Sequence, residues 1–163
     1  MFLPVSKVPA QTLAAIAIAS FAAVGFALIA QHGFDVKPCP WCVMQRGIFL
    51  LIGAVSALAW AFALSNPQRK AMLGVVLALA VCGVAAAVFQ HQVAANLESC
   101  AMTLADRINT ALGLEDRWPY VFMVTASCAE AAAYRLLGLS YDIWSGLLFL
   151  LIAAAGLRAI VRR

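Results

Sequence analysis

Four apolar segments, each long enough to cross a lipid bilayer, constrain this chain more than any other feature. They cover roughly residues 13–30, 43–64, 71–89 and 143–161, and about 20 apolar residues suffice for a transmembrane helix. Because 65% of the 163 residues are hydrophobic and only 11% are charged, the composition excludes an ordinary soluble domain. The sequence therefore predicts an all-α integral membrane protein, a four-helix bundle forming one domain over residues 1–163.

Charged residues are distributed unevenly around these segments. The basic residues that flank them on one side are Lys7, Arg69, Lys70, Arg158, Arg162 and Arg163, and all seven acidic residues fall on the other side. Positive charges near helix ends stay in the cytoplasm. We therefore expect both termini to be cytoplasmic and the segments of about 31–42 and 90–142 to lie outside. The net charge of +4 reflects this topology, and no nucleic-acid partner is expected.

The outer end of the second segment carries two cysteines, Cys39 and Cys42, within the sequence Pro-Cys-Pro-Trp-Cys. Two cysteines at this spacing can close a small disulfide, and the prolines hold the pair at a helix start. There the helix dipole and the unpaired backbone donors favour a thiolate at Cys42. Arg46 follows four residues later, on the same helix face. An Arg within a membrane span is costly and indicates a functional site.

The third segment contains one cysteine and ends in a polar cluster. Cys82, near its middle, is expected to be buried and inert. The end of the segment reads Gln90-His91-Gln92 and lies at the same depth as Cys42 and Arg46. Two interpretations of His91 remain open: an interfacial residue that anchors the helix, or a hydrogen-bond partner for a polar head group held between the second and third helices.

The outer segment of about 90–142 contains signals for short helices. A helix lying on the membrane surface is predicted by apolar residues at helical spacing, among them Met102, Ala105, Ile108 and Leu112. Ser127 and Glu130 fit a capping box, which predicts a helix that starts at Cys128 and runs to residue 137. The start of this helix would favour a thiolate at Cys128.

Four of the five cysteines, Cys39, Cys42, Cys100 and Cys128, lie outside or at the outer rim. Purely structural disulfides would not explain a CxxC motif beside an embedded Arg, and a zinc site would usually contain a second CxxC motif. We favour a redox pair that exchanges with a soluble protein and expect no metal. The CxxC spacing pairs Cys39 with Cys42, which leaves Cys100 with Cys128 among the three possible connectivities.

These features together resemble the DsbB family of disulfide bond formation proteins. The resemblance rests on four spans, the run Pro38-Cys39-Pro40-Trp41-Cys42-Val43-Met44-Gln45-Arg46, the outer pair, and Ala126-Ser127-Cys128-Ala129-Glu130. It implies an enzyme of the bacterial inner membrane that reoxidises a periplasmic, DsbA-like oxidase of the thioredoxin fold. The electrons would pass to the membrane quinone pool, with ubiquinone as the expected cofactor and menaquinone as the alternative.

The resemblance also implies a role for each candidate site residue. Cys100 would form the mixed disulfide with the soluble oxidase, and Cys128 would resolve it and pass the reducing equivalents to Cys39. Cys42 would face the quinone. Arg46 would stabilise the thiolate and the reduced quinone oxygen, with His91 as a second contact. The alternative from another class is a membrane subunit that binds or transports a metal with its outer thiolates.

Overall fold

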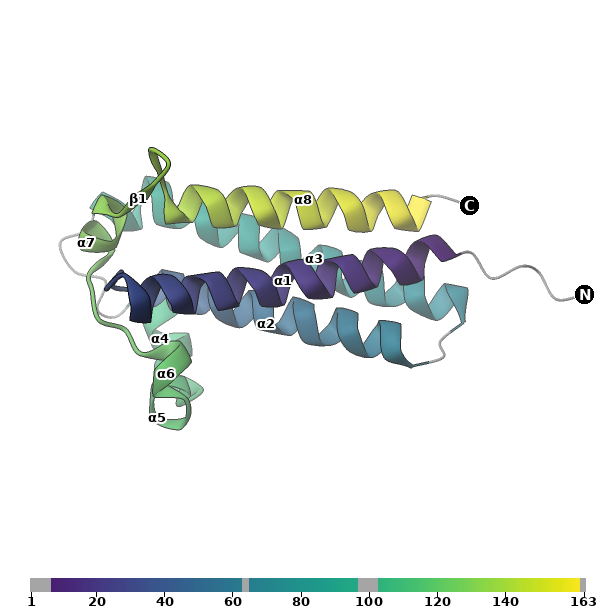
Figure 1. Cartoon of the computed structure of the whole chain (residues 1–163), viewed down its shortest axis with the longest axis horizontal. Helices are drawn as coiled ribbons and strands as arrows, with labels where there is room; N and C mark the ends of the chain where they lie inside the picture. The colour runs from purple at the N-terminus through teal and green to yellow at the C-terminus, as the bar shows by residue number, and fades with distance from the viewer. Residues whose placement is uncertain (1–6, 63–64, 97–102, 162–163) are drawn as a thin grey trace, which may run out of the picture.

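Four long helices form the main body of the protein (Figure 1). The computed structural model describes residues 7–62, 65–96 and 103–161. The long helices are α1 (Lys7–Gly33), α2 (Pro40–Ala61), α3 (Asn66–Gln92) and α8 (Tyr141–Val161). Each of them is long and apolar enough to cross a membrane. The prediction of an all-α, four-helix membrane bundle is therefore confirmed, and the chain is a multi-pass membrane protein.

Local capping explains where two of these helices begin. Pro40 occupies the first turn of α2, directly after Cys39, and Pro67 occupies the first turn of α3. A proline fits there because the first backbone N–H groups of a helix have no intrahelical partner. At α3 the backbone N–H of Ser65 also donates to Gln68 Oε1 at 2.9 Å. With Cys39 as its cap and Pro40 as its first residue, α2 begins three residues before the predicted apolar segment.

The long helices pack in pairs, α1 along α2 and α3 along α8, with α2 joining the pairs through α3. Phe49 and Phe149 stack at the centre, with ring centroids 3.9 Å apart, and both are buried. Gly83 makes this packing possible, because a Cβ atom built on it would lie 2.5 Å from the Phe149 ring.

We expect Gly83→Ala to destabilise the bundle by about 1–3 kcal/mol, the usual cost of overpacking a core. The contact is with the base of the Phe149 ring as well as its edge, so the ring cannot simply rotate away. Thermal unfolding in detergent measures the effect. Gly74→Ala in the same helix is the matched control, since nothing lies within 4 Å of that position. Equal stability of the two variants would contradict this packing.

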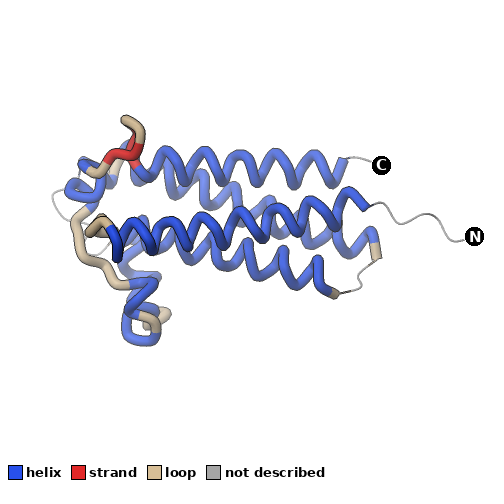
Figure 2. The backbone as a smooth tube through the Cα atoms, in the orientation of Figure 1, coloured by secondary structure: helices blue, strands red, loops and turns tan. Residues whose placement is uncertain are grey.

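The short elements gather at one end of the bundle, opposite the start of α1 and the end of α8 (Figures 1 and 2). They are η1 (Ala94–Asn96), α4 (Leu104–Ala111), α5 (Leu114–Arg117), α6 (Pro119–Phe122) and α7 (Cys128–Ala133). The helix predicted from the apolar spacing is present as α4, with Ala105 buried and Leu104 exposed. Its contact with a membrane surface stays a prediction.

The helix predicted to run from Cys128 to residue 137 is too long. It ends at Ala133, and a small antiparallel hairpin follows, formed by β1 (Arg135–Leu136) and β2 (Leu139–Ser140). Both turn residues have positive φ, 52° at Leu137 and 85° at Gly138, as a tight two-residue hairpin requires. The indole N–H of Trp144 donates to the Leu136 carbonyl at 3.0 Å and ties the hairpin to α8.

One prediction about the cysteines is wrong, and others fall outside the described residues. Cys82 is exposed on the surface of α3 and not packed inside the bundle. Val81 beside it is exposed as well, so this face of α3 is turned away from the other described helices. Cys100, Met102, Arg162 and Arg163 lie outside the described residues.

Candidate functional site

The CxxC motif forms the start of α2. Cys39 is the N-cap residue, and its Sγ accepts a hydrogen bond from the backbone N–H of Cys42 at 3.3 Å. The two sulfur atoms are 2.9 Å apart. This geometry follows from the sequence, because an N-cap side chain faces the N–H groups of the first helical turn. The pair is therefore placed at a helix N-terminus, as the sequence predicts.

The two sulfurs lie in different surroundings. Cys39 is completely buried, in a cluster that includes Trp41, whose ring centroid lies 4.7 Å from that of Phe89. Cys42 is only partly buried and lines a cavity. The pKa of the Cys39 thiol is raised, most of all by the hydrogen bond that it shares with Cys42 and next by its burial. These surroundings favour the protonated thiol at Cys39, and Cys42 is the sulfur that faces the cavity.

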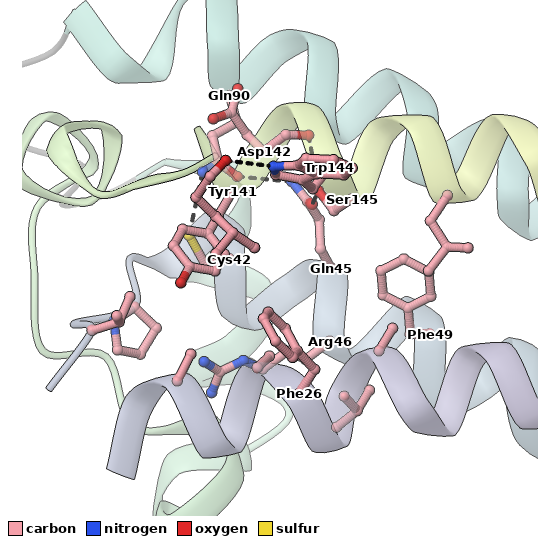
Figure 3. Close-up of a pocket in the computed structure, with 18 of the residues that line it drawn as sticks. Phe26, Cys42, Gln45, Arg46, Phe49, Gln90, Tyr141, Asp142, Trp144 and Ser145 are labelled. Carbon is pink, nitrogen blue, oxygen red and sulfur yellow. Dashed lines mark hydrogen bonds between the residues drawn. The ribbon is translucent and has the colours of Figure 1, made fainter. Parts of the chain in front are cut away.

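The cavity that Cys42 lines has a volume of about 610 Å³ and lies between α1, α2 and α8 (Figure 3). Its walls are mostly apolar, with Phe26 from α1 and Leu148 from α8 among them. The polar side chains gather at its outer end, near Cys42. The cavity is of a size typical for small-molecule sites, about 300–1,000 Å³.

A chain of buried amides leads from Cys42 into the bundle. Gln90 Nε2 donates to Cys42 Sγ at 3.3 Å, and Gln45 Nε2 donates to Gln90 Oε1 at 2.8 Å. Ser145 Oγ lies within hydrogen-bond distance of both Gln45 Oε1 and the Asp142 carbonyl, although its single proton serves one of them at a time. Figure 3 shows these side chains converging from α2, α3 and α8. They fix the position of Cys42 with partners on three helices.

Arg46 lies within the bundle with only 7% of its surface exposed. Its Nη1 donates to Gln31 Oε1 at the end of α1 and to the Val121 carbonyl in α6, the latter at 2.9 Å. Both partners are neutral, and the described residues provide no carboxylate for this guanidinium. Arg46 therefore brings to the cavity that Cys42 lines a positive charge that has no carboxylate in contact with it among the described residues.

His91 does not line this cavity. Its Nδ1 lies 2.7 Å from Asp142 Oδ2, and its side chain is 55% exposed. Asp142 is buried and does line the cavity. The structure thus brings His91 to the edge of the site, one residue away from the cavity wall.

Cys128 is the first residue of α7 and is disulfide-bonded, whereas Cys100 lies outside the described residues. The capping box predicted for Ser127 and Glu130 is present. Cys128 and Cys39 belong to the same small buried cluster, with Trp41, Ala86, Ala94, Ala105 and Ala131. The structure therefore brings Cys128 into the packing around the buried sulfur of the CxxC pair.

A backbone junction joins the outer segment that carries Cys128 to the start of α2, which carries Cys39. The Pro38 carbonyl, one residue before Cys39, accepts hydrogen bonds from the N–H groups of Thr125 at 3.0 Å and Ala126 at 3.2 Å. Asn109 on α4 also donates to the Pro40 carbonyl at 3.1 Å. The outer segment is thus fastened to the start of α2 on both sides of Cys39.

We expect Ser127→Ala to lower the local stability of α7 by about 1 kcal/mol, the usual cost of losing an N-cap. That corresponds to about fivefold less amide protection in hydrogen exchange. The Ser127 backbone N–H, and then its hydroxyl, lower the pKa of Glu130. The contribution of Glu130 to the stability of α7 is therefore present above the unfolded pKa of Glu and is lost as pH falls through the pKa that Glu130 has in the folded protein. Glu130→Gln should remove the pH dependence, and identical protection in all three proteins would contradict the cap.

The sequence alone did not identify Gln31, Gln45, Asp142 or Ser145 as site residues. Gln90 was noted only as a member of the polar cluster at residues 90–92. An available signal was the presence of amide side chains inside apolar segments, where unpaired polar groups are costly. Within residues 7–62, 65–96 and 103–161, no group of three or more His, Cys, Asp or Glu side chains could hold a metal.

Comparisons with known proteins identify the family of this chain. The family model for DsbB, disulfide bond formation protein DsbB, matches residues 9–159. Disulfide bond formation protein B of Cupriavidus metallidurans is 33% identical over 149 residues, 91% of this chain and 90% of its own. Disulfide bond formation protein B 2 of Burkholderia lata is 36% identical over 146 residues, 88% of this chain and 84% of its own. The chain therefore belongs to the DsbB family and is a membrane protein of disulfide bond formation.

Proposed function

We propose that this protein is a quinone-linked thiol oxidase that reoxidises a periplasmic, DsbA-like protein of the thioredoxin fold. The observation that carries the proposal is the position of the Cys42 sulfur, which opens on an apolar cavity next to the buried charge of Arg46. A redox-active dithiol that faces such a cavity needs an apolar electron acceptor. A membrane quinone has that character.

The residues around the cavity fit a quinone. The apolar walls suit the ring and its hydrocarbon tail, and the polar end offers a guanidinium and amide N–H donors for the ring oxygens. We propose that Arg46 would hold one ring oxygen and that Cys42 would exchange electrons with the quinone. His91 would act on the bound quinone through Asp142. When bound, the quinone would supply a two-electron, two-proton acceptor. Ubiquinone is the first candidate, and menaquinone is the alternative.

The cysteines have separate roles in this proposal. Cys100 forms the mixed disulfide with the soluble dithiol protein, whose second thiol then closes that protein's disulfide and leaves Cys100 and Cys128 reduced. These thiols attack the Cys39–Cys42 disulfide, so that their own disulfide reforms and the CxxC pair becomes a dithiol. The pair of electrons then leaves from Cys42, and the Cys39–Cys42 disulfide closes again. The shared buried cluster of Cys39 and Cys128 supports this route.

The proposed location is the bacterial inner membrane, with both termini in the cytoplasm. The basic residues Arg69, Lys70 and Arg158 lie at the start of α3 and the end of α8, opposite the end that carries the site (Figure 1). Positive charges retain a helix end in the cytoplasm. The site then faces the periplasm, where the soluble partner is found.

The test is an assay of the purified protein with a reduced thioredoxin-fold dithiol protein and either ubiquinone or menaquinone. We expect one quinone to be reduced for each dithiol oxidised, because each step transfers two electrons. Reduction must require both substrates. If the dithiol is oxidised at the same rate without either quinone, the proposal is wrong.

A further inference from the structure

Asp142 is a buried carboxylate in the wall of the cavity, and its position needs an explanation. Only 5% of its surface is exposed, and its residue is the second of α8. Of the described residues that line the cavity, it is the only one with a carboxylate. A carboxylate in such a place is costly unless it is paired. Its partner is His91, with Nδ1 and Oδ2 2.7 Å apart.

His91 extends this pair to the surface of the protein. It lies one residue before the end of α3 at the outer end of the bundle, and its side chain is 55% exposed. Since a carboxylate oxygen accepts, Nδ1 carries the hydrogen of this bond, and Nε2 is the nitrogen left to exchange protons with water. The pair therefore connects the outer surface with the cavity wall through two groups that can each take up and release a proton.

We propose that His91 and Asp142 form the proton path between the outer water and the cavity. The inference rests on the proposed function, because that reaction needs such a path. Two electrons and two protons leave Cys39 and Cys42 when their disulfide closes, and two electrons and two protons are taken up by the quinone. The thiol protons go to water, and protons for the quinone enter at His91 Nε2, leave from Nδ1 to Asp142 Oδ2 and pass into the cavity. The overall proton count is unchanged.

The other groups at the cavity are less suited to this task. Arg46 is held by Gln31 and Val121, and a guanidinium does not release its proton in proteins. Lys37 is exposed and lies before the start of α2. The amides of Gln45 and Gln90 hold Cys42 in position but do not titrate. Tyr141 lines the cavity next to Asp142 but lacks the histidine contact.

The first test uses His91→Ala and Asp142→Asn in the quinone reduction assay, with His32→Ala as the matched control. His32 is the only other histidine in the chain. It is exposed, and its Nε2 donates to the Tyr120 carbonyl at 3.0 Å, outside the cavity. We expect kcat to fall about 100-fold or more in the first two variants, the lower end of what a positioned proton-transfer group contributes. The KM for quinone should not change in His91→Ala, because His91 does not line the cavity. Added imidazole should restore His91→Ala and leave Asp142→Asn unrestored.

A second measurement does not depend on quinone. In the quinone-free protein, the Nδ1–H of His91 should give a slowly exchanging signal in a ¹⁵N–¹H spectrum, absent from His91→Ala and lost in Asp142→Asn. Reduction of the cysteine pairs by the soluble dithiol protein should proceed at the normal rate in both variants. A failed proposed function would show as no quinone reduction in the unmodified protein.

Two outcomes would overturn the proton path. One is a kcat of His91→Ala equal to that of His32→Ala. The other is a lowered kcat that imidazole does not restore, which would indicate a positioning role for the ring alone. If Asp142→Asn does not fold, the exposed His91 still decides the question through its own variant and the imidazole rescue.

Discussion

Cys42→Ser is expected to reduce the rate of quinone reduction to the uncatalysed background. Serine has nearly the shape of cysteine, but its hydroxyl can neither form a disulfide with Cys39 nor carry the electron pair. Cys42 is also the sulfur that faces the cavity, so no other described thiol can replace it there. The measurement follows quinone absorbance with a reduced thioredoxin-fold dithiol protein as the electron source.

Cys82→Ser is the matched control for this result. It makes the same substitution at an exposed position on α3, and we expect it to keep the full rate. A single-turnover experiment adds a further check, because Cys42→Ser should still exchange one disulfide with the soluble protein through the outer pair. If quinone reduction survives Cys42→Ser, or Cys39→Ser, undiminished, the assigned route is wrong.

Arg46→Ala should have the second largest effect, which is a raised apparent KM for quinone. A hydrogen bond to a charged group contributes about 1.5–3 kcal/mol, and about 1.4 kcal/mol corresponds to a tenfold change in affinity. We therefore expect the KM to rise by about 10–100-fold. The bonds of Arg46 to Gln31 and Val121 are also lost, so a fall in thermal stability is expected alongside.

Two further variants separate the effect of the Arg46 charge on KM from the effect of its contacts on stability. Gln31→Ala removes one partner of Arg46 but keeps the charge, and it should cost some stability with little change in KM. Lys37→Ala removes the exposed cation at the edge of the cavity. Because an exposed charge contributes about 1 kcal/mol or less, the rise in KM should be smaller than in Arg46→Ala. An unchanged apparent affinity in Arg46→Ala would remove Arg46 from the site.

Helical periodicity made much of the redox site predictable. Cys39, Cys42 and Arg46 are close in sequence, and the spacing of three and four residues fixes their relative positions once a helix is assumed. The hydropathy of the four segments fixes the bundle in the same way, because a backbone in lipid must satisfy its own hydrogen bonds. The cap at Ser127 is likewise a local pattern.

The polar partners could not be predicted because they depend on how distant helices pack. Gln90 reaches Cys42 across 48 residues, and His91 reaches Asp142 across 51. Both contacts depend on the rotation of α3 about its axis, which Gly83 and Phe149 help to set. The hairpin after α7 was missed for a different reason. A positive φ is uncommon for a bulky residue such as Leu137, and no short sequence pattern predicts this turn.

The junction at the Pro38 carbonyl has a consequence for how the outer segment can diverge. Its two donors are the backbone N–H groups of Thr125 and Ala126, and every residue except proline carries such a group. The position of Cys128 relative to Cys39 is thus set by backbone groups, and only the buried Ala126 of these two donors also limits the size of its side chain. Substitutions can accumulate at the exposed Thr125, and the outer face can change there, while the register between Cys39 and Cys128 stays the same. A proline at residue 125 or 126 is the change that this junction does not tolerate.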